Sequence, residues 1–487
     1  MLPDAFDLLK SVWATVGPHF GSDKAPPRFW THLKETFQEA WEMIEPAWNG
    51  EMDDWILLEE SCRHVGLRIG GILLTLAVLF LNARVIERSC AKCAKCRPVR
   101  RWRERDLKTT CGNITLFRQE HDCACGTQSV PVDRALGLPP DDRVSPDLVL
   151  WSLKVGATLS YAASKRFFHD LTGQDVISAQ GVHDQVATVG QILPEMNVVP
   201  PATTPGQLPA QVIADVDGAI VGLHHTAKPK TPKPAAPEAT TEQASIKRKK
   251  RRRNVQFEVY VGRIYERHDV LLDGKMHVYK HLAFGGGVSR AGDDVPLVMF
   301  NLVNQRFPGA IPDRVVYVRG DGAQGIDTIA GKFPKKERLL DQYHTLVKVT
   351  ERVKEAFPDL DPRKRRAIDD ELSNLLRAGD ATGMLEQLTL LEDHPTLRSK
   401  EPLQRLAFHI HKHRDHIWYP LAKEMGIGVG TGITEKDVDL VLDRRYELRG
   451  MSWTPIGIRN NLRVRLTLFN ETSSNLAQAV RQRQPRP

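Results

Sequence analysis

Acidic side chains lie inside or directly after two strongly apolar segments of the chain. Asp217 lies within the apolar stretch 212–221, and Asp321 comes shortly after a second one at 314–318. Asp215 precedes Asp217 by two residues, so both side chains are expected on the same face of a strand. Each acid alone could be a turn or capping residue. Because a carboxylate in an apolar strand is costly unless it is hydrogen-bonded or coordinates a cation, the pair on two strands predicts a shared polar site.

Carboxylates that gather at the strand ends of an α/β sheet suit phosphodiester chemistry. Mg²⁺ is a hard cation that prefers oxygen ligands and keeps several of its waters. Two such ions, ~4 Å apart, can activate an attacking oxygen and stabilise the leaving one. Three acids from separate elements can hold both ions and leave room for DNA, so a site that uses Mg²⁺ (or Mn²⁺) is predicted.

Cysteines form a second group with the spacing of metal ligands. Cys90, Cys93 and Cys96 make overlapping Cys-x-x-Cys pairs, and Cys123 and Cys125 follow later in the chain. Thiolates are preferred zinc ligands, and two pairs at this separation suit a tetrahedral zinc ribbon. Either Cys90 with Cys93 or Cys93 with Cys96 could form the first pair, and thiols without a metal are the remaining interpretation.

Basic residues are concentrated in two places. The net charge is +8, and one uninterrupted basic run consists of Lys247, Arg248, Lys249, Lys250, Arg251, Arg252 and Arg253. Such a run stays solvated unless it meets phosphates, so it predicts polyanion binding, with a plain surface loop as the alternative. It lies in a polar insert, residues 226–254, that is expected to be disordered. Further arginines beside the cysteines would serve DNA recognition: Arg97, Arg100, Arg101, Arg103 and Arg105.

The chain has 487 residues, which is too long for one core and predicts roughly three or four folded units. Its start lacks the basic region of a signal peptide. The most apolar stretch, residues 69–81, is shorter than the ~20 residues that cross a bilayer, so it is expected to be a buried helix. A cytoplasmic protein without a membrane partner is predicted.

The succession of helical, strand-like and polar segments along the chain predicts a multidomain α/β protein. The expected segments are an N-terminal helical region (1–88), a zinc ribbon (89–127), a helix-turn-helix-like region (140–195), the first part of a catalytic core (208–345), a helical insertion (346–424), the last part of the core (425–470) and a tail (471–487). Three strands, a helix, a strand and further helices follow the order of an RNase H-like domain, here interrupted by an all-helical insertion. The helix-turn-helix spacing could serve DNA, but such hairpins are common without it.

Three weaker patterns in the sequence favour ordinary structural roles. Helix caps in the insertion are predicted at Asp359, Asp380 and Thr396. A set of histidines, His409, His411, His413 and His416, invites a metal interpretation. Only His409 and His413 have the useful i, i+4 spacing, so a solvated helical face is expected. The glycines at 285–287 predict a turn and lack the lysine of a phosphate loop.

Five short motifs, in order, resemble those of bacterial insertion-sequence DDE transposases of the ISLre/ISKra-like group. They are Asp217-Gly218, Arg319-Gly320-Asp321-Gly322-Ala323, Leu340-Asp341-Gln342-Tyr343-His344, Gly430-Thr431-Gly432-Ile433-Thr434-Glu435, and Arg449-Gly450-Met451-Ser452-Trp453 with the segment 460–465 behind it. The resemblance covers most of the chain, from the cysteines to about residue 470. Two features depart from the group: the basic insert is longer, and Thr431 stands where serine is usual.

The resemblance implies that Asp217, Asp321 and Glu435 form a metal-binding triad. It also implies that Asp341 and His344 support the active site. Trp453 would stack on DNA or pack against the catalytic helix. For zinc it favours Cys90, Cys93, Cys123 and Cys125.

The activity that the resemblance implies is cleavage of element ends and transfer of the 3′-hydroxyl strand into target DNA. The implied partners are double-stranded DNA and a second copy of the chain, in a homodimer or higher oligomer at the bacterial nucleoid. Two alternatives stay open: an RNase H-like nuclease that does not join strands, and a non-catalytic zinc-ribbon protein that binds DNA.

Overall fold

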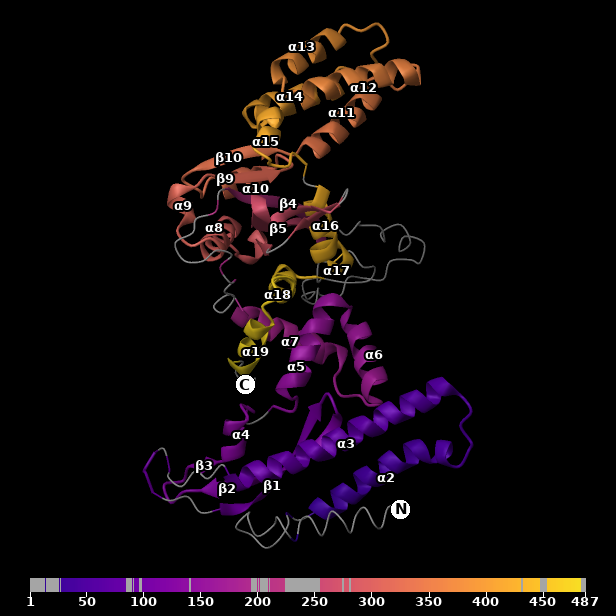
Figure 1. Ribbon diagram of the computed structural model, residues 1–487, viewed down its shortest axis with the longest axis vertical. Coiled ribbons are helices and arrows are strands. Elements are labelled where there is room, and N and C mark those ends of the chain that lie inside the picture. Colours follow the sequence, from indigo (N-terminus) through magenta and orange to yellow (C-terminus); the bar gives the residue numbers. More distant parts are fainter. Residues whose placement is uncertain are drawn as a thin grey trace, which may run out of the picture. The chain divides into compact units, whose positions relative to one another are not determined.

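The protein is a mixed α/β chain that folds as two compact units, seen in a computed structural model (Figure 1). The structure describes residues 28–84, 92–95, 99–139, 142–193, 211–223, 255–273, 276–279, 282–430, 432–446 and 453–482, with single residues at 14, 26, 90, 199, 201 and 209. Unit 1 comprises Met1–Met196 and Ser474–Pro487, and unit 2 comprises Asn197–Ser473.

Unit 1 begins with two long helices, α2 (Phe29–Trp48) and α3 (Trp55–Arg84), which pack against each other. Their shared core includes Phe29, Leu33 and Leu79, because these apolar side chains recur at helical spacing. Both helices lie in the N-terminal region that the sequence predicts to be helical.

Helix α3 is longer than the predicted buried stretch. Its segment Trp55–Asn82 is long and apolar enough to cross a membrane, by length and composition alone, with 33% of its most apolar window buried. The expectation of a buried helix holds for one side only: Leu79 is fully buried, whereas Leu73 is 60% exposed. Apolar residues occur all round this helix, so packing on one side leaves others in solvent.

A small antiparallel sheet follows in unit 1. It consists of β1 (Val99–Thr109), β2 (Gly112–Asp122) and β3 (Gln128–Ser129), in the order β1-β2-β3, and α4 (Pro131–Ala135) packs against β2. Helix α3 covers one side of β2. This is the segment that the sequence predicts to be a zinc ribbon.

Three helices complete the main part of unit 1: α5 (Pro146–Thr158), α6 (Tyr161–Thr172) and α7 (Ala179–Ile192). Each begins at a serine, Ser145, Ser160 or Ser178, whose side chain accepts a backbone N–H of the first turn. Helices α6 and α7 are the hairpin that the sequence predicts, and α5 packs against both. The C-terminal helix α19 (Ser473–Gln482) belongs almost entirely to unit 1.

Unit 2 is built on a five-stranded mixed sheet. In chain order its strands are β4 (Val212–Leu223), β5 (Val255–Glu266), β8 (Ala283–Gly287), β9 (Val316–Gly320) and β10 (Lys336–Leu340). Their order in space is β10-β9-β4-β5-β8. The first three strands pair antiparallel, and β9 and β10 then add in parallel on the free side of β4. A separate hairpin is made by β6 (Val270–Asp273) and β7 (Met276–Tyr279).

The two faces of β4 have different roles because its side chains alternate. Val212, Ala214 and Val216 join a core with the helices that follow β8. These helices are α8 (Val295–Arg306), α9 (Ala310–Asp313) and α10 (Gln324–Ala330). Ile213 faces a second core formed with the helices after β10. Asp215 and Asp217 share this second face.

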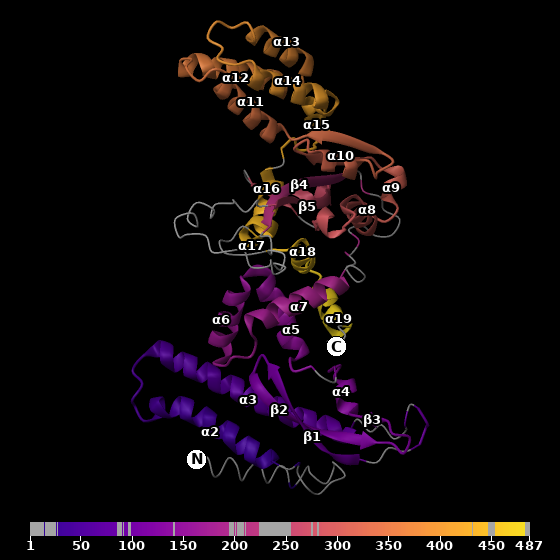
Figure 2. The same ribbon diagram turned by 180° about the vertical axis from the view of Figure 1, so that it is seen from behind.

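A group of helices follows β10: α11 (Gln342–Ala356), α12 (Pro362–Arg377), α13 (Ala381–Leu391), α14 (Glu401–His413) and α15 (Tyr419–Glu424). Helices α11 to α14 pack against one another (Figures 1 and 2). Of the predicted caps, Asp380 is confirmed. Asp359 and Thr396 are wrong, since Asp361 caps α12 and α14 begins only after Lys400.

The chain then returns to the sheet. Helix α16 (Gly432–Val438) packs against β4 and β5 and continues through a π-helical turn (Asp439–Asp443) into α17 (Arg444–Tyr446). Figures 1 and 2 show α16, in yellow, beside β4. The π turn therefore interrupts the helical segment that carries Glu435. Helix α18 (Pro455–Phe469) packs against β8.

Candidate active site and cysteine cluster

Asp217 lies near the middle of β4, on the face that α16 covers. Its register partner on β5 is Val261, and its carboxylate accepts the backbone N–H of Gly218 at 2.8 Å. The side chain is partly exposed, in contrast to Asp215 two residues earlier, which is fully buried. Asp217 is therefore the acid of this strand that a ligand could reach.

Asp321 directly follows β9, between two glycines that the local geometry requires. A side chain at Gly320 would place its Cβ 2.3 Å from Ile326 Cδ1, and one at Gly322 would lie 3.0 Å from His413 Nε2. Gly322 also has a φ of +88°, which L side chains rarely adopt. The backbone turns sharply here, and the Asp321 carboxylate accepts the N–H of Ala323 at 2.9 Å.

Glu435 is supplied by α16, far along the chain from both aspartates. His344 Nε2 lies 3.0 Å from Glu435 Oε1, and His344 Nδ1 lies 3.4 Å from Asp341 Oδ1. Asp341 is buried and caps α11, accepting the N–H of His344 at 2.6 Å. The N–H of Asp341 in turn bonds to the carbonyl oxygen of Gly320 at 2.9 Å. His344 thus lies between a fixed cap beside the Asp321 loop and the glutamate of α16.

Electrostatics show that these groups act on one another. The pKa of Asp217 is raised to about 6, chiefly by burial and further by the negative charges of Asp321 and Glu435, against the Gly218 hydrogen bond and the charge of His344. The pKa of His344 is raised by its contact with Asp341, and the charges of Asp217 and Glu435 add to that effect against burial. The negative charges of Asp321 and Glu435, from separate elements, therefore act on the carboxylate of Asp217.

The spacing of this group is wider than that of a closed metal cage. Within the described ranges, only four cysteines bring three or more ligand atoms within 4.8 Å of one another. Carboxylates that bind two ions ~3.5–4 Å apart can have ligand atoms more than 4.8 Å from one another.

Asp215 has a structural role that the sequence does not reveal. Its carboxylate accepts Arg263 Nη2 at 2.9 Å, Arg319 Nε at 2.5 Å and Tyr265 Oη at 3.0 Å. Burial alone would raise its pKa, but Arg319 and Arg263 hold the pKa below its ordinary value. Arg263 also lies 3.2 Å from Asp437 of α16. This network joins β4, β5, β9 and α16 directly behind the acidic group.

Trp453 packs inside the protein. It is 4% exposed, the Arg445 guanidinium lies 4.7 Å from its ring centroid, and Tyr446 meets it edge-on at 5.0 Å. Of the two expected roles, packing against the helical segment that continues α16 is the one seen. Burial leaves no face of the ring for DNA.

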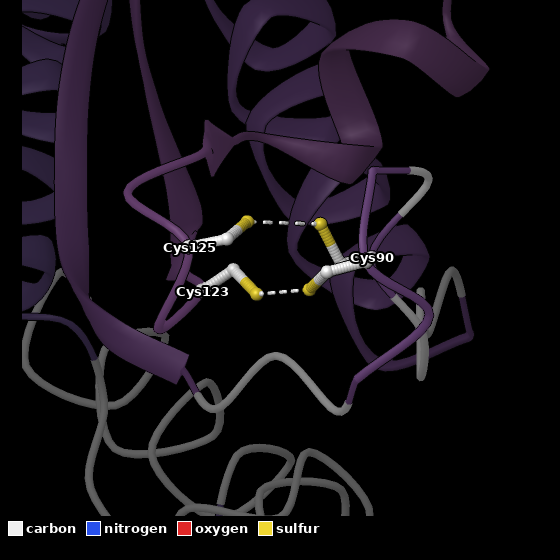
Figure 3. A group of neighbouring side chains, drawn as sticks. Cys90, Cys123 and Cys125 are labelled. Carbon is white, nitrogen blue, oxygen red and sulfur yellow. Dashed lines mark hydrogen bonds between the residues drawn. The ribbon is translucent and has the colours of Figure 1, made fainter.

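The four cysteines form one cluster in unit 1. Cys90 Sγ lies 3.6 Å from Cys125 Sγ, and Cys93 Sγ lies 3.2 Å from Cys123 Sγ, with all four sulfurs within 4.8 Å. Figure 3 shows the side chains of Cys123 and Cys125 pointing at the facing loop that carries Cys90. A tetrahedral site with Zn–S bonds of ~2.3 Å needs sulfurs ~3.8 Å apart, so the four thiols could bind a metal ion such as zinc. Cys96, the alternative ligand, lies outside the described residues.

The arginines beside this cluster are engaged within the protein. Arg105 is buried and bonds to Asp133 at 3.1 Å, and Arg101 and Arg103 both pair with Glu120. Arg101 and Arg103 share the single carboxylate of Glu120 and keep more than half of their side chains exposed, so their use in DNA recognition stays a prediction. Arg97 and the basic run Lys247–Arg253 lie outside the described residues.

Of the histidines predicted to lie on a solvated helical face, His411 is exposed, His409 and His416 are partly buried, and His413 is buried. His413 is 1% exposed and packs its ring 4.9 Å from that of His409. Burial lowers the pKa of each to about 4. Sequence spacing could not show this, because the Asp321 loop that covers His413 lies far away in the chain. The metal interpretation gains nothing, since these histidines form no ligand group of three within the parts of the chain described.

No protein-family model matches the chain, and no curated protein matches it either.

Proposed function

We propose that this chain is a DDE transposase, which cleaves DNA ends and transfers the 3′-hydroxyl strand into target DNA. The observation that carries the proposal is the convergence of Asp217, Asp321 and Glu435. They come from β4, the end of β9 and α16. Burial raises the pKa of Asp217 to about 6, and the negative charges of Asp321 and Glu435 add to that effect.

The order of the sheet supports an RNase H-like core. Three antiparallel strands come first in the chain, and two parallel strands then add beside the first of them. The helices α11 to α15 stand between β10 and α16, where a helical insertion would separate the second and third acids. This arrangement matches the order of elements expected from the sequence.

The donor set suits Mg²⁺ or Mn²⁺. Three carboxylates supply hard oxygen ligands, and their mutual repulsion would be relieved by a cation. When bound, the metal pair would activate the attacking oxygen and stabilise the leaving one. Asp217, Asp321 and Glu435 would hold the ions, and His344 would orient Glu435 through its other contact to Asp341.

Double-stranded DNA is the proposed partner, and a homodimer or higher oligomer would bring two element ends together. The basic run 247–253 would bind phosphates, with an affinity that falls steeply with salt. Zinc at the cysteine cluster would stabilise the small sheet of unit 1. Such an enzyme would work on DNA in the cytoplasm, at the nucleoid.

A strand-transfer assay tests the proposal. The purified protein would be incubated with Mg²⁺, DNA fragments that span the flanks of its gene, and a plasmid target. Joined products that need a free 3′ hydroxyl are expected. Cleavage without joining would replace the proposal with a nuclease, and DNA binding without cleavage would replace it with a DNA-binding protein.

A further inference from the structure

A groove of about 660 Å³ opens beside Asp321, between helices α11 and α14. Lys348 and Arg352 line it from α11, and Arg405, Phe408 and Lys412 line it from α14. The volume is that of a small-molecule site. The groove is open to solvent, and its volume is enough for a nucleotide or two.

The charge of the groove suits a phosphodiester strand. Four basic side chains, those of Lys348, Arg352, Arg405 and Lys412, line the groove with two acids, Asp321 and Glu401. Arg352 pairs with Glu355 and Arg405 pairs with Glu401, so a phosphate would share these arginines with a carboxylate. The Lys348 ammonium donates to the carbonyl oxygen of Asp321 at 3.3 Å. A phosphate bound at this end of the groove would therefore lie next to the proposed catalytic acids.

Histidines form the floor of the groove. His409 Nε2 and His413 Nδ1 are buried and have no hydrogen-bond partner among the residues that the structure describes. Burial lowers the pKa of both to about 4, so they are neutral near pH 7. Neutral imidazoles can donate to or accept from the polar edge of a base without adding charge.

An aromatic ring is exposed at the groove, where apolar surface is otherwise costly. Phe408 is 70% exposed although it lies on the amphipathic helix α14, one residue from His409. Exposed aromatic rings interleaved with basic residues are typical of proteins that bind single-stranded nucleic acids, because unpaired bases stack on them.

We propose that this groove holds a single DNA strand next to the cleaved phosphate, with its phosphates on Lys412 and Arg405 and an unpaired base on Phe408. The inference rests on the proposed function, since it assigns the strand to the DNA that the acids would cut. The unpaired state follows from the exposed ring of Phe408, on which an unstacked base could stack.

The experiment measures binding of labelled oligothymidine by fluorescence anisotropy, with Ca²⁺ in place of Mg²⁺ so that no cutting interferes. A hairpin duplex of the same length is the comparison ligand. Test variants are Phe408→Ala, Phe408→Tyr and the pair Arg405→Gln with Lys412→Gln. Controls on the same helical group are Leu390→Ala, which is 69% exposed, and the pair Lys364→Gln with Arg366→Gln.

Phe408→Ala is expected to weaken oligothymidine binding about tenfold, while Phe408→Tyr and Leu390→Ala leave it near wild type. The Arg405→Gln and Lys412→Gln pair removes two phosphate contacts, so the slope of log affinity against log salt concentration should fall in magnitude by about 1.4. The control pair should leave this slope unchanged. Duplex binding should change little in every variant.

Two results would overturn the proposal: Phe408→Ala that binds oligothymidine like Leu390→Ala, or an equal loss for hairpin and single strand. A different result would contradict the transposase proposal: a wild type that never cleaves DNA. If cleavage is intact and the Phe408 and Arg405–Lys412 variants bind the strand normally, only the proposed role of the groove is contradicted.

Discussion

His344 Nε2 lies 3.0 Å from Glu435 Oε1, and the same ring contacts the buried cap Asp341. Glu435 is carried by a short helix that continues into a π turn, and the contact with His344 holds its carboxylate in place. In the proposed enzyme, His344 would be a positioning residue for Glu435.

Replacement of His344 by alanine should lower cleavage by about 10–100-fold and raise the Mg²⁺ concentration that half-saturates the reaction. The neighbouring Tyr343→Phe is the control, because Tyr343 is 54% exposed and lies next in sequence. An unchanged Mg²⁺ dependence in His344→Ala would show that the histidine does not orient Glu435.

Asp215 is expected to matter for stability more than for chemistry. Asp215→Asn removes the carboxylate charge that the buried Arg263 and Arg319 share, which should reduce the free energy of unfolding by about 3–5 kcal/mol. The exposed Asp415→Asn should change it by less than about 0.5 kcal/mol. Urea unfolding measures both, and equal values for the two variants would contradict the structural role.

Acid should weaken the same network. The pKa of Asp215 in the folded protein lies below its ordinary value, so its contribution is present above the unfolded pKa of ~3.9 and is lost as the pH falls through the folded pKa. The stability of the wild type should therefore fall below about pH 4 more steeply than that of Asp215→Asn. Parallel pH profiles of the two proteins would rule this out.

Gly322 offers a test of the loop that carries Asp321. Gly322→Ala places a methyl group against His413 and Leu340 at a φ of +88°, whereas Gly292→Ala has a φ of +89° with nothing within 4 Å. Both should lose about 1–2 kcal/mol of stability from the backbone alone. Only Gly322→Ala should also lose cleavage, because its loop must shift. Equal cleavage by the two variants would mean that the position of Asp321 is not critical.

Zinc is tested by its removal. The purified protein should contain one zinc ion per chain, and Cys93→Ser should lose it, because Cys93 Sγ lies in the four-sulfur cluster. The exposed Cys62→Ser should keep the metal. Elemental analysis with native mass spectrometry measures the zinc content of each protein. A metal-free wild type would show that the cluster consists of four thiols without a metal.

Local patterns in the sequence predict much of this architecture. The helical hairpin within 140–195 and the cap at Asp380 depend on short-range signals, and both agree with the structure. Capping is less certain where two aspartates compete: Asp359 is predicted, yet Asp361 precedes Pro362 and caps α12.

Long-range contacts are what the sequence could not supply. Asp215 and Asp217 look equivalent in the chain, and only the arginines of β5 and β9 make the first structural and leave the second accessible. His413 appears solvated by spacing, but it is buried under the Asp321 loop. Such differences arise from pairing between distant strands and helices, which no local pattern encodes.

The most direct test of the account is Mg²⁺-dependent cleavage of gene-flanking DNA by the wild type and by Asp321→Asn. Asp370→Asn, an exposed acid on α12, is the control. Cleavage is expected in the wild type and the control and should fall by several orders of magnitude in Asp321→Asn, with thermal unfolding unchanged. Equal cleavage by the folded Asp321→Asn protein would contradict the assignment of Asp217, Asp321 and Glu435 as the catalytic acids.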